Sequence, residues 1–146
     1  MAETLRRCGV AYARTTVSTE RFDIPTNWLQ MPATCHHRNP RLMELARDFV
    51  ERDTRWRPQL FYLWGHSYEF EDNDNWHVIE EFADFMGGRD NIWYATNIEI
   101  HDYVEAYRHL QTSADGNRVY NPTAIAVFFG CDGQHYAVQP GQEICL

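Results

Sequence analysis

The feature that most constrains this chain is an unbroken apolar run over residues 60–64, which ends at Gly65 and His66. A continuous run of this length is typical of a strand covered on both faces, because a half-exposed strand alternates apolar and polar residues. Such strands belong to parallel sheets whose faces are covered by helices. We therefore expect a buried parallel strand at 60–64.

Helical patterns lie on both sides of this run. Residues 39–53 combine Asn39 as a capping residue, Pro40 at a first helical position and apolar residues at helical spacing. A second pattern covers about 75–86, and a third begins at Thr96 with the spacing of a capping box. We also expect a short helix at 2–8 and short strands at 10–13 and 91–95. This alternation predicts an α/β fold with a largely parallel sheet.

The pattern changes after Ser113. Residues 113–146 are rich in β-forming residues and contain the turn signals Asp132-Gly133 and Pro140-Gly141. We expect an antiparallel β-hairpin here, as an appendage of the domain formed by residues 1–112. Only about three buried strands precede it, whereas a closed parallel barrel needs more than about 200 residues.

Charge and composition limit the possible partners. The 146 residues include 13 basic and 21 acidic ones, for a formal charge of -8. Phosphate binding depends on a basic surface, so nucleic acid and anionic membranes are not expected partners. No apolar run has the length of a membrane span, and the first residues lack a secretory signal, so we expect a cytoplasmic protein. The four cysteines form no C-x-x-C pair and are expected to be free thiols.

His66 is the first candidate for chemistry. It follows the 60–64 run, and ligands of parallel α/β proteins gather at the carboxyl ends of strands. Its pKa range suits a group that gives or takes a proton. The alternative is a loop histidine with a local hydrogen bond.

The second candidate is the pair His36 and His37. Adjacent histidines on a strand point to opposite sides, so the pair by itself is a poor metal site. One of them could contact a ligand, both could be solvated, or both could join His66 in a new metal-ligand set. A nearby acidic run is expected to be a solvated loop, and comprises Glu69, Glu71, Asp72 and Asp74.

Several aromatic residues could stack on a sugar ring or fill the core. These are Trp28, Trp64, Tyr68 and Trp93. Taken together, five segments resemble, in order and spacing, the C-terminal half of the polysaccharide deacetylase (NodB-homology) family. They are "LRRCGVAYART", "FDIPTNWLQMPATCHH", "LFYLWGHSYEFE", "WYATNIEIHDYVEA" and "NPTAIAVFF".

The resemblance implies a fold and a reaction. It implies a partial, incomplete distorted (β/α)7-type barrel, and metal-dependent removal of acetyl groups from N-acetylated sugars. His66 matches the family's catalytic acid, and Trp64, Trp28 and Tyr68 would shape the sugar pocket. Asn27 stands where the family has an aspartate that tunes the acid, and would orient His66 by a hydrogen bond.

The resemblance also implies a divalent metal, zinc or similar, whose family ligands would lie before residue 1. The catalytic base would be missing too, so we expect the isolated chain to have little or no deacetylase activity. The alternative is a non-catalytic sugar-binding or oligomerising module. In that case a homodimer or an upstream fragment would cover the open edge of the barrel.

Overall fold

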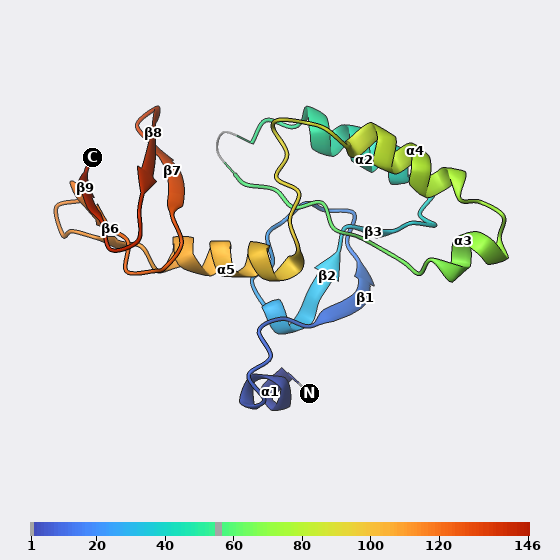
Figure 1. The fold of residues 1–146 in the computed structure, drawn as a ribbon, viewed down its shortest axis with the longest axis horizontal. Helices are drawn as coiled ribbons and strands as arrows, with labels where there is room; N and C mark the ends of the chain where they lie inside the picture. The colour runs from blue at the N-terminus through green and yellow to red at the C-terminus, as the bar shows by residue number, and fades with distance from the viewer. Residues whose placement is uncertain (1, 55–56) are drawn as a thin grey trace. The chain divides into compact units, whose positions relative to one another are not determined.

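The computed structural model describes residues 2–54 and 57–146 (Figure 1). The chain forms two compact units, one ending at Trp93 and the other running from Tyr94 to Leu146. In the first unit, β1 (Arg14–Ser18) pairs in parallel with β2 (Met31–Ala33). The next pair, β3 (Cys35–His36) with β4 (Leu63–Trp64), is also parallel.

Thr34 links these two strand pairs. Its carbonyl accepts a hydrogen bond from Glu20 N at 2.8 Å, and its N–H donates to Tyr62 O at 2.8 Å. The segment of β2 and β3 therefore lies between β1 and β4. The His36 and Trp64 positions are direct partners in the β3–β4 register, so the carboxyl ends of these two strands lie side by side.

The first unit also contains helices. They are α1 (Ala2–Arg7), the 3-10 helix η1 (Trp28–Gln30), α2 (Leu42–Glu51), α3 (Tyr68–Asp72) and α4 (His77–Met86). α2 and α4 pack side by side (Figure 1). Their apolar faces bury a cluster around Phe22, Cys35, Leu42 and Leu45, joined by Phe61, Leu63 and Phe82. The helices expected at 39–53 and 75–86 are confirmed, with later starts.

The second unit is built from one helix and antiparallel strands. Helix α5 (Asn97–Arg108) begins at Thr96, where the capping box expected from the sequence is present. The strands β5 (Gln111–Thr112), β6 (Arg118–Tyr120) and β9 (Glu143–Cys145) form a sheet in the order β5-β6-β9. β7 (Val127–Cys131) and β8 (Gln134–Val138) form a hairpin. Asp132 and Gly133 make its turn with φ of 49° and 79°.

The prediction of a partial (β/α)7-type barrel is wrong. The described residues form four small sheets of two or three strands, and none of them closes. The stretches 10–13 and 91–95 form no strand, and the 60–64 run contributes only Leu63–Trp64 to a ladder. A barrel needs each strand to pair on both sides. Apolar composition marks a buried segment, but it does not supply that second partner.

Within residues 2–54 and 57–146, none of the helices is long and apolar enough to cross a membrane.

Candidate functional site

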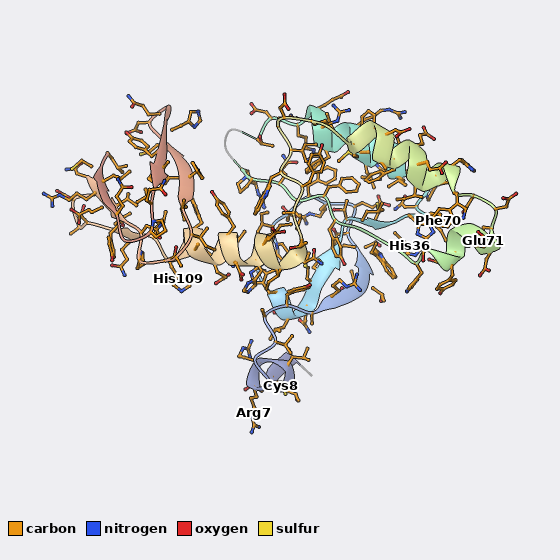
Figure 2. All side chains as sticks on the ribbon, in the orientation of Figure 1. Arg7, Cys8, His36, Phe70, Glu71 and His109 are labelled. Atoms are coloured by element: carbon orange, nitrogen blue, oxygen red, sulfur yellow. The ribbon has the colours of Figure 1, made fainter. Side chains whose placement is uncertain are left out.

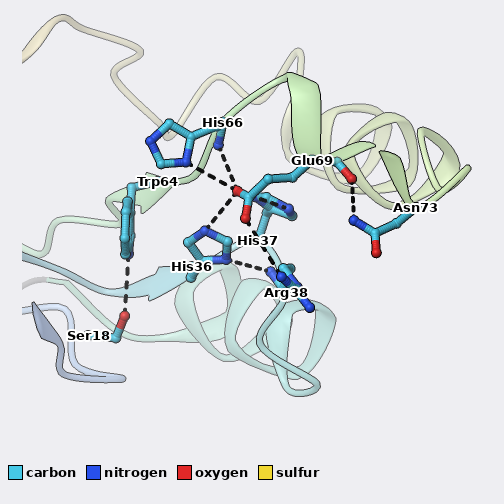
Figure 3. A network of polar contacts seen from close by, with 8 residues as sticks. All are labelled: Ser18, His36, His37, Arg38, Trp64, His66, Glu69 and Asn73. Carbon is cyan, nitrogen blue, oxygen red and sulfur yellow. Dashed lines mark hydrogen bonds and ion pairs between the residues drawn. The ribbon is translucent and has the colours of Figure 1, made fainter. Parts of the chain in front are cut away.

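Four polar residues of the first unit converge where β3 and β4 end. His36 closes β3 and His37 follows it, while Gly65 and His66 follow Trp64 at the end of β4. The short helix α3 then brings Glu69 to the same place (Figure 3). Figure 2 shows His36 and Phe70 of α3 in this part of the unit. Two segments that are separate in the sequence, 36–37 and 64–69, thus meet at one point, as expected at the carboxyl ends of parallel strands.

Glu69 is the centre of this group, which we call the Glu69 cluster: His36, His37, His66 and Glu69. Glu69 Oε2 lies 3.2 Å from His36 Nε2, 3.3 Å from His66 Nδ1 and 3.8 Å from His37 Nε2. It also accepts the backbone N–H of His66 at 3.1 Å. The other carboxylate oxygen lies 3.7 Å from a guanidinium nitrogen of Arg38. One carboxylate therefore faces three imidazoles (Figure 3).

These contacts control the charge on Glu69. Partial burial of the carboxyl group opposes ionisation, but the hydrogen bonds from His66 and the nearby His36 and His37 outweigh it. The net effect lowers the pKa of Glu69, so this side chain is a carboxylate at neutral pH.

The hydrogen bonds also select the tautomers of two imidazoles. His36 Nδ1 accepts the backbone N–H of Arg38 at 3.2 Å, so a neutral His36 carries its proton on Nε2, which lies 3.2 Å from Glu69 Oε2. His66 Nδ1 faces Glu69 and donates to it. His66 Nε2 is then left with a lone pair, on a side chain that is 53% exposed.

His37 differs from its neighbours. Its side chain is 2% exposed, and neither ring nitrogen has a hydrogen-bond partner among the described residues. Burial, followed by the proximity of His36, lowers the pKa of His37, so the ring is neutral. The ring lies against Gly65, where a Cβ atom would come within 1.9 Å of His37 Nδ1. Gly65 is therefore required because the imidazole occupies the space of a side chain.

Aromatic rings enclose the cluster. The Trp64 ring meets His36 edge-on at a centroid distance of 4.5 Å, and its Nε1 donates to Ser18 Oγ at 3.4 Å. The Tyr68 ring stacks on His66 at 5.2 Å and is 60% exposed. Phe70 packs on His37 at 4.2 Å on the buried side. Phe70 forms the buried side of the cluster, and Trp64 and Tyr68 form what we call its rim.

The structure brings together some of the predicted site residues and separates others. His66, Trp64 and Tyr68 lie together at the Glu69 cluster. Trp28 begins η1 and is a buried core residue. Asn27 caps η1: its side chain accepts from Leu29 N and donates to Gln30 Oε1. The hydrogen bonds described for Asn27 do not include His66, whose orienting partner is Glu69.

The sequence interpretation missed Glu69, which was assigned to a solvated acidic run. Its position three residues after His66 is the available signal, because a glutamate at that spacing can reach back to the backbone N–H at a helix start. The residues present also fit a divalent metal of the kind the resemblance implies. His36, His66 and Glu69 each offer one ligand atom, and these atoms lie within 4.8 Å of one another.

Comparisons of the chain with protein-family models, curated proteins and solved structures gave no match. The resemblance to polysaccharide deacetylases therefore stays a prediction.

Proposed function

We propose that this chain is a hydrolase that removes an acetyl group from a sugar-like molecule, with His66 as the proton-transfer group, in place of the little or no activity expected from the sequence. The observation that carries the proposal is the pair of contacts between Glu69 Oε2 and His66, at 3.1 Å to the backbone N–H and 3.3 Å to Nδ1. They hold the ring in one orientation and leave Nε2 as the basic nitrogen of a side chain that is 53% exposed. A carboxylate behind an imidazole also stabilises the imidazolium that forms when Nε2 takes a proton.

The chemistry follows from this arrangement. His66 Nε2 takes a proton from a water molecule as the water oxygen bonds to the acetyl carbon. The imidazolium then gives this proton to the leaving nitrogen or oxygen as its bond to the acetyl carbon breaks. Acetic acid and a free amine or alcohol are the products, and His66 returns to its starting state. An alcohol leaves more readily than an amine, so we expect acetyl esters to react faster than acetamides.

The rim of the cluster favours a sugar-like substrate. The exposed ring of Tyr68 and the edge of Trp64 flank His66, and aromatic faces of this kind pack against the apolar face of a sugar ring. The N-acetylated sugar class comes from the family resemblance. A divalent metal, which the resemblance also implies, would polarise the acetyl carbonyl. In this chain the residues that fit such an ion include His66 itself, so the ion and the proton transfer compete for one imidazole.

Acetate release in the presence of EDTA tests the proposal. The substrates are p-nitrophenyl acetate and N-acetylglucosamine oligomers, and the variants are His66→Ala and Glu69→Gln. We expect His66→Ala to reduce the wild-type rate by about 10²-fold or more, as is usual for loss of an acid–base group. His77→Ala is the matched control, since His77 is an exposed histidine of α4 outside the cluster. A wild-type rate equal to that of His66→Ala would refute the proposal.

A second candidate function is sugar binding without turnover, favoured by the 60% exposure of Tyr68 at the rim. It predicts saturable binding of N-acetylglucosamine oligomers that Tyr68→Ala abolishes and His66→Ala preserves. Binding of this kind, together with no acetate release, would select the binding module over the hydrolase.

A further inference from the structure

His37 is the least explained group of the first unit. An imidazole has two nitrogens that form hydrogen bonds, and a buried pair without partners is rare in native proteins. Each unsatisfied buried nitrogen destabilises the folded chain. His37 Nε2 points toward Glu69 Oε2, but at 3.8 Å the two atoms are too far apart for a hydrogen bond. A further atom or ion that contacts both would be needed to satisfy His37 Nε2.

Two of the distances from Glu69 match the spacing of ligand atoms in a tetrahedral metal site. With metal–ligand bonds of about 2.0–2.1 Å, neighbouring ligand atoms in a tetrahedron are about 3.3–3.4 Å apart. Glu69 Oε2 lies 3.2 Å from His36 Nε2 and 3.3 Å from His66 Nδ1. His37 Nε2 lies 3.8 Å from Glu69 Oε2 but outside the group of His36, His66 and Glu69, whose ligand atoms are all within 4.8 Å of one another, so its ring must move toward them to join the set.

We propose that His36, His37, His66 and Glu69 together bind one divalent transition metal ion, and that the bound ion switches off proton transfer by His66. Three imidazoles and one carboxylate suit Zn²⁺ or Co²⁺, whereas Mg²⁺ and Ca²⁺ prefer sites built from oxygen. The four ligands come from the ends of β3 and β4 and from α3, so the ion ties three segments together. The switch rests on the proposed function, but the metal site does not.

Binding of the ion changes which nitrogens of His66 and His36 carry a proton. His37 Nε2 has no hydrogen-bond partner to give up. The Nδ1 proton of His66 leaves when Nδ1 binds the metal, and a proton on Nε2 then keeps the ring neutral. Nε2 no longer has a lone pair, so His66 cannot act as a base. His36 likewise exchanges its Nε2 proton for the metal and carries a proton on Nδ1, which ends the hydrogen bond from Arg38 N.

Titration with Co²⁺, followed by its visible absorption, tests the metal site. We expect the wild-type protein to bind one Co²⁺ with the intense bands of a four-coordinate ion. His37→Phe keeps an aromatic ring between His36 and Phe70 but has no ligand atom. We expect its affinity to fall by more than about 100-fold, since even partners outside the ligand set change affinity by 10–100-fold. His77→Phe serves as the control and should bind like the wild type.

Two outcomes would overturn the site. A wild-type protein that binds no Co²⁺ removes it altogether, and His37→Phe with unchanged affinity and spectrum removes His37 from the ligand set. Circular dichroism melting of each metal-free variant shows whether it is folded. If His37→Phe does not fold, His37→Gln and Glu69→Gln take its place with the same expected loss of affinity.

The switch is tested separately by adding Zn²⁺ to the p-nitrophenyl acetate assay. The wild-type rate should fall along the same curve as metal binding. At a Zn²⁺ concentration that fully inhibits the wild type, the rate of His37→Phe should equal its own rate without Zn²⁺. A rate that rises or stays constant as Zn²⁺ binds would overturn the switch. An absence of turnover in EDTA would overturn the proposed function and the switch, while the Co²⁺ titration would still decide the metal site.

Discussion

Two buried polar side chains, one in each unit, behave in opposite ways. Asn121 in the second unit is fully buried, and all of its hydrogen-bonding capacity is used. Its Nδ2 donates to Ile125 O at 2.8 Å and to Val138 O at 2.9 Å. Its Oδ1 accepts from Thr123 N at 3.0 Å and from Thr123 Oγ1 at 2.7 Å. Asn121 thereby joins the segment before β7 to the end of β8.

His37 in the first unit is almost as deeply buried, at 3% exposure, but neither of its nitrogens is satisfied within the described chain. A buried polar group that builds a fold finds its partners inside that fold. One that lacks them lowers stability unless a ligand supplies the missing contact. The difference separates a structural residue from a residue of a binding site.

The largest expected effect is at Asn121. Replacing it with leucine removes one donor from each of Ile125 O and Val138 O and the acceptor of Thr123 N, and we expect a loss of about 3–4 kcal/mol in the free energy of unfolding. Urea denaturation followed by circular dichroism measures the change. Asn91→Leu, at an exposed position, is the control and should change the stability by less than about 0.5 kcal/mol. A loss below about 1 kcal/mol in the unfolding free energy of Asn121→Leu would contradict the structural role of Asn121, and with it the difference from His37.

The next effect is at Gly65. A Cβ atom there would meet His37 Nδ1 at 1.9 Å, so Gly65→Ala must displace the ring. We expect a loss of about 1–3 kcal/mol, the usual range for overpacking. In the background of His37→Ala the same substitution should cost at least about 1 kcal/mol less, because the clash is gone. Equal costs in both backgrounds, measured by urea denaturation, would show that the two residues are not coupled.

His37→Phe should have little effect on the metal-free protein. Removing unsatisfied nitrogens while keeping a ring is expected to change the unfolding free energy by about 1 kcal/mol or less, and in the stabilising direction. Zn²⁺ should increase the unfolding free energy of the wild type more than that of His37→Phe. At a Zn²⁺ concentration of 100 times Kd, the wild type gains about 2.7 kcal/mol and His37→Phe gains much less. Thermal melts with and without Zn²⁺ measure both quantities, and equal gains would contradict the ligand role.

The smallest effect concerns Cys35, a buried group of the same unit that needs no ligand. Burial, with a smaller contribution from the charge of Glu20, raises the pKa of the Cys35 thiol to about 11. At pH 8 the exposed Cys8 and Cys145 should react with a maleimide in the native state, while Cys35 should react only after unfolding. Peptide mapping of the labelled protein detects this, and native labelling of Cys35 would contradict it.

The same shift makes stability depend on pH. The folded thiol keeps its proton at a pH where the unfolded thiol has lost it. Its contribution is therefore complete below the ordinary thiol pKa of about 9, and is lost as the pH rises toward 11. Urea denaturation at pH 8 and pH 10 should show a decrease that is smaller in Cys35→Ala.

Local patterns predicted the local structure well. The capping box at Thr96 and Glu99, the helical spacing in α2 and α4, and the Asp132-Gly133 turn depend on residues a few positions apart, and all of them form. The site was predicted in part. His66 was identified because it follows a buried run, and His36 and His37 were considered as ligands with it. Glu69 was not, since nothing in an acidic run shows which carboxylate turns inward.

The sequence by itself determined the helices, the turns and the position of His66 after a strand, because short-range geometry and apolar spacing control these features. Only the tertiary structure decided that the strands form small open sheets and that Glu69 gathers three imidazoles. The pairing of β3 with β4 depends on contacts between residues nearly thirty positions apart. Such contacts have no local signature, so the hydrogen bonds that Asn121 forms and His37 lacks become visible only in the folded chain.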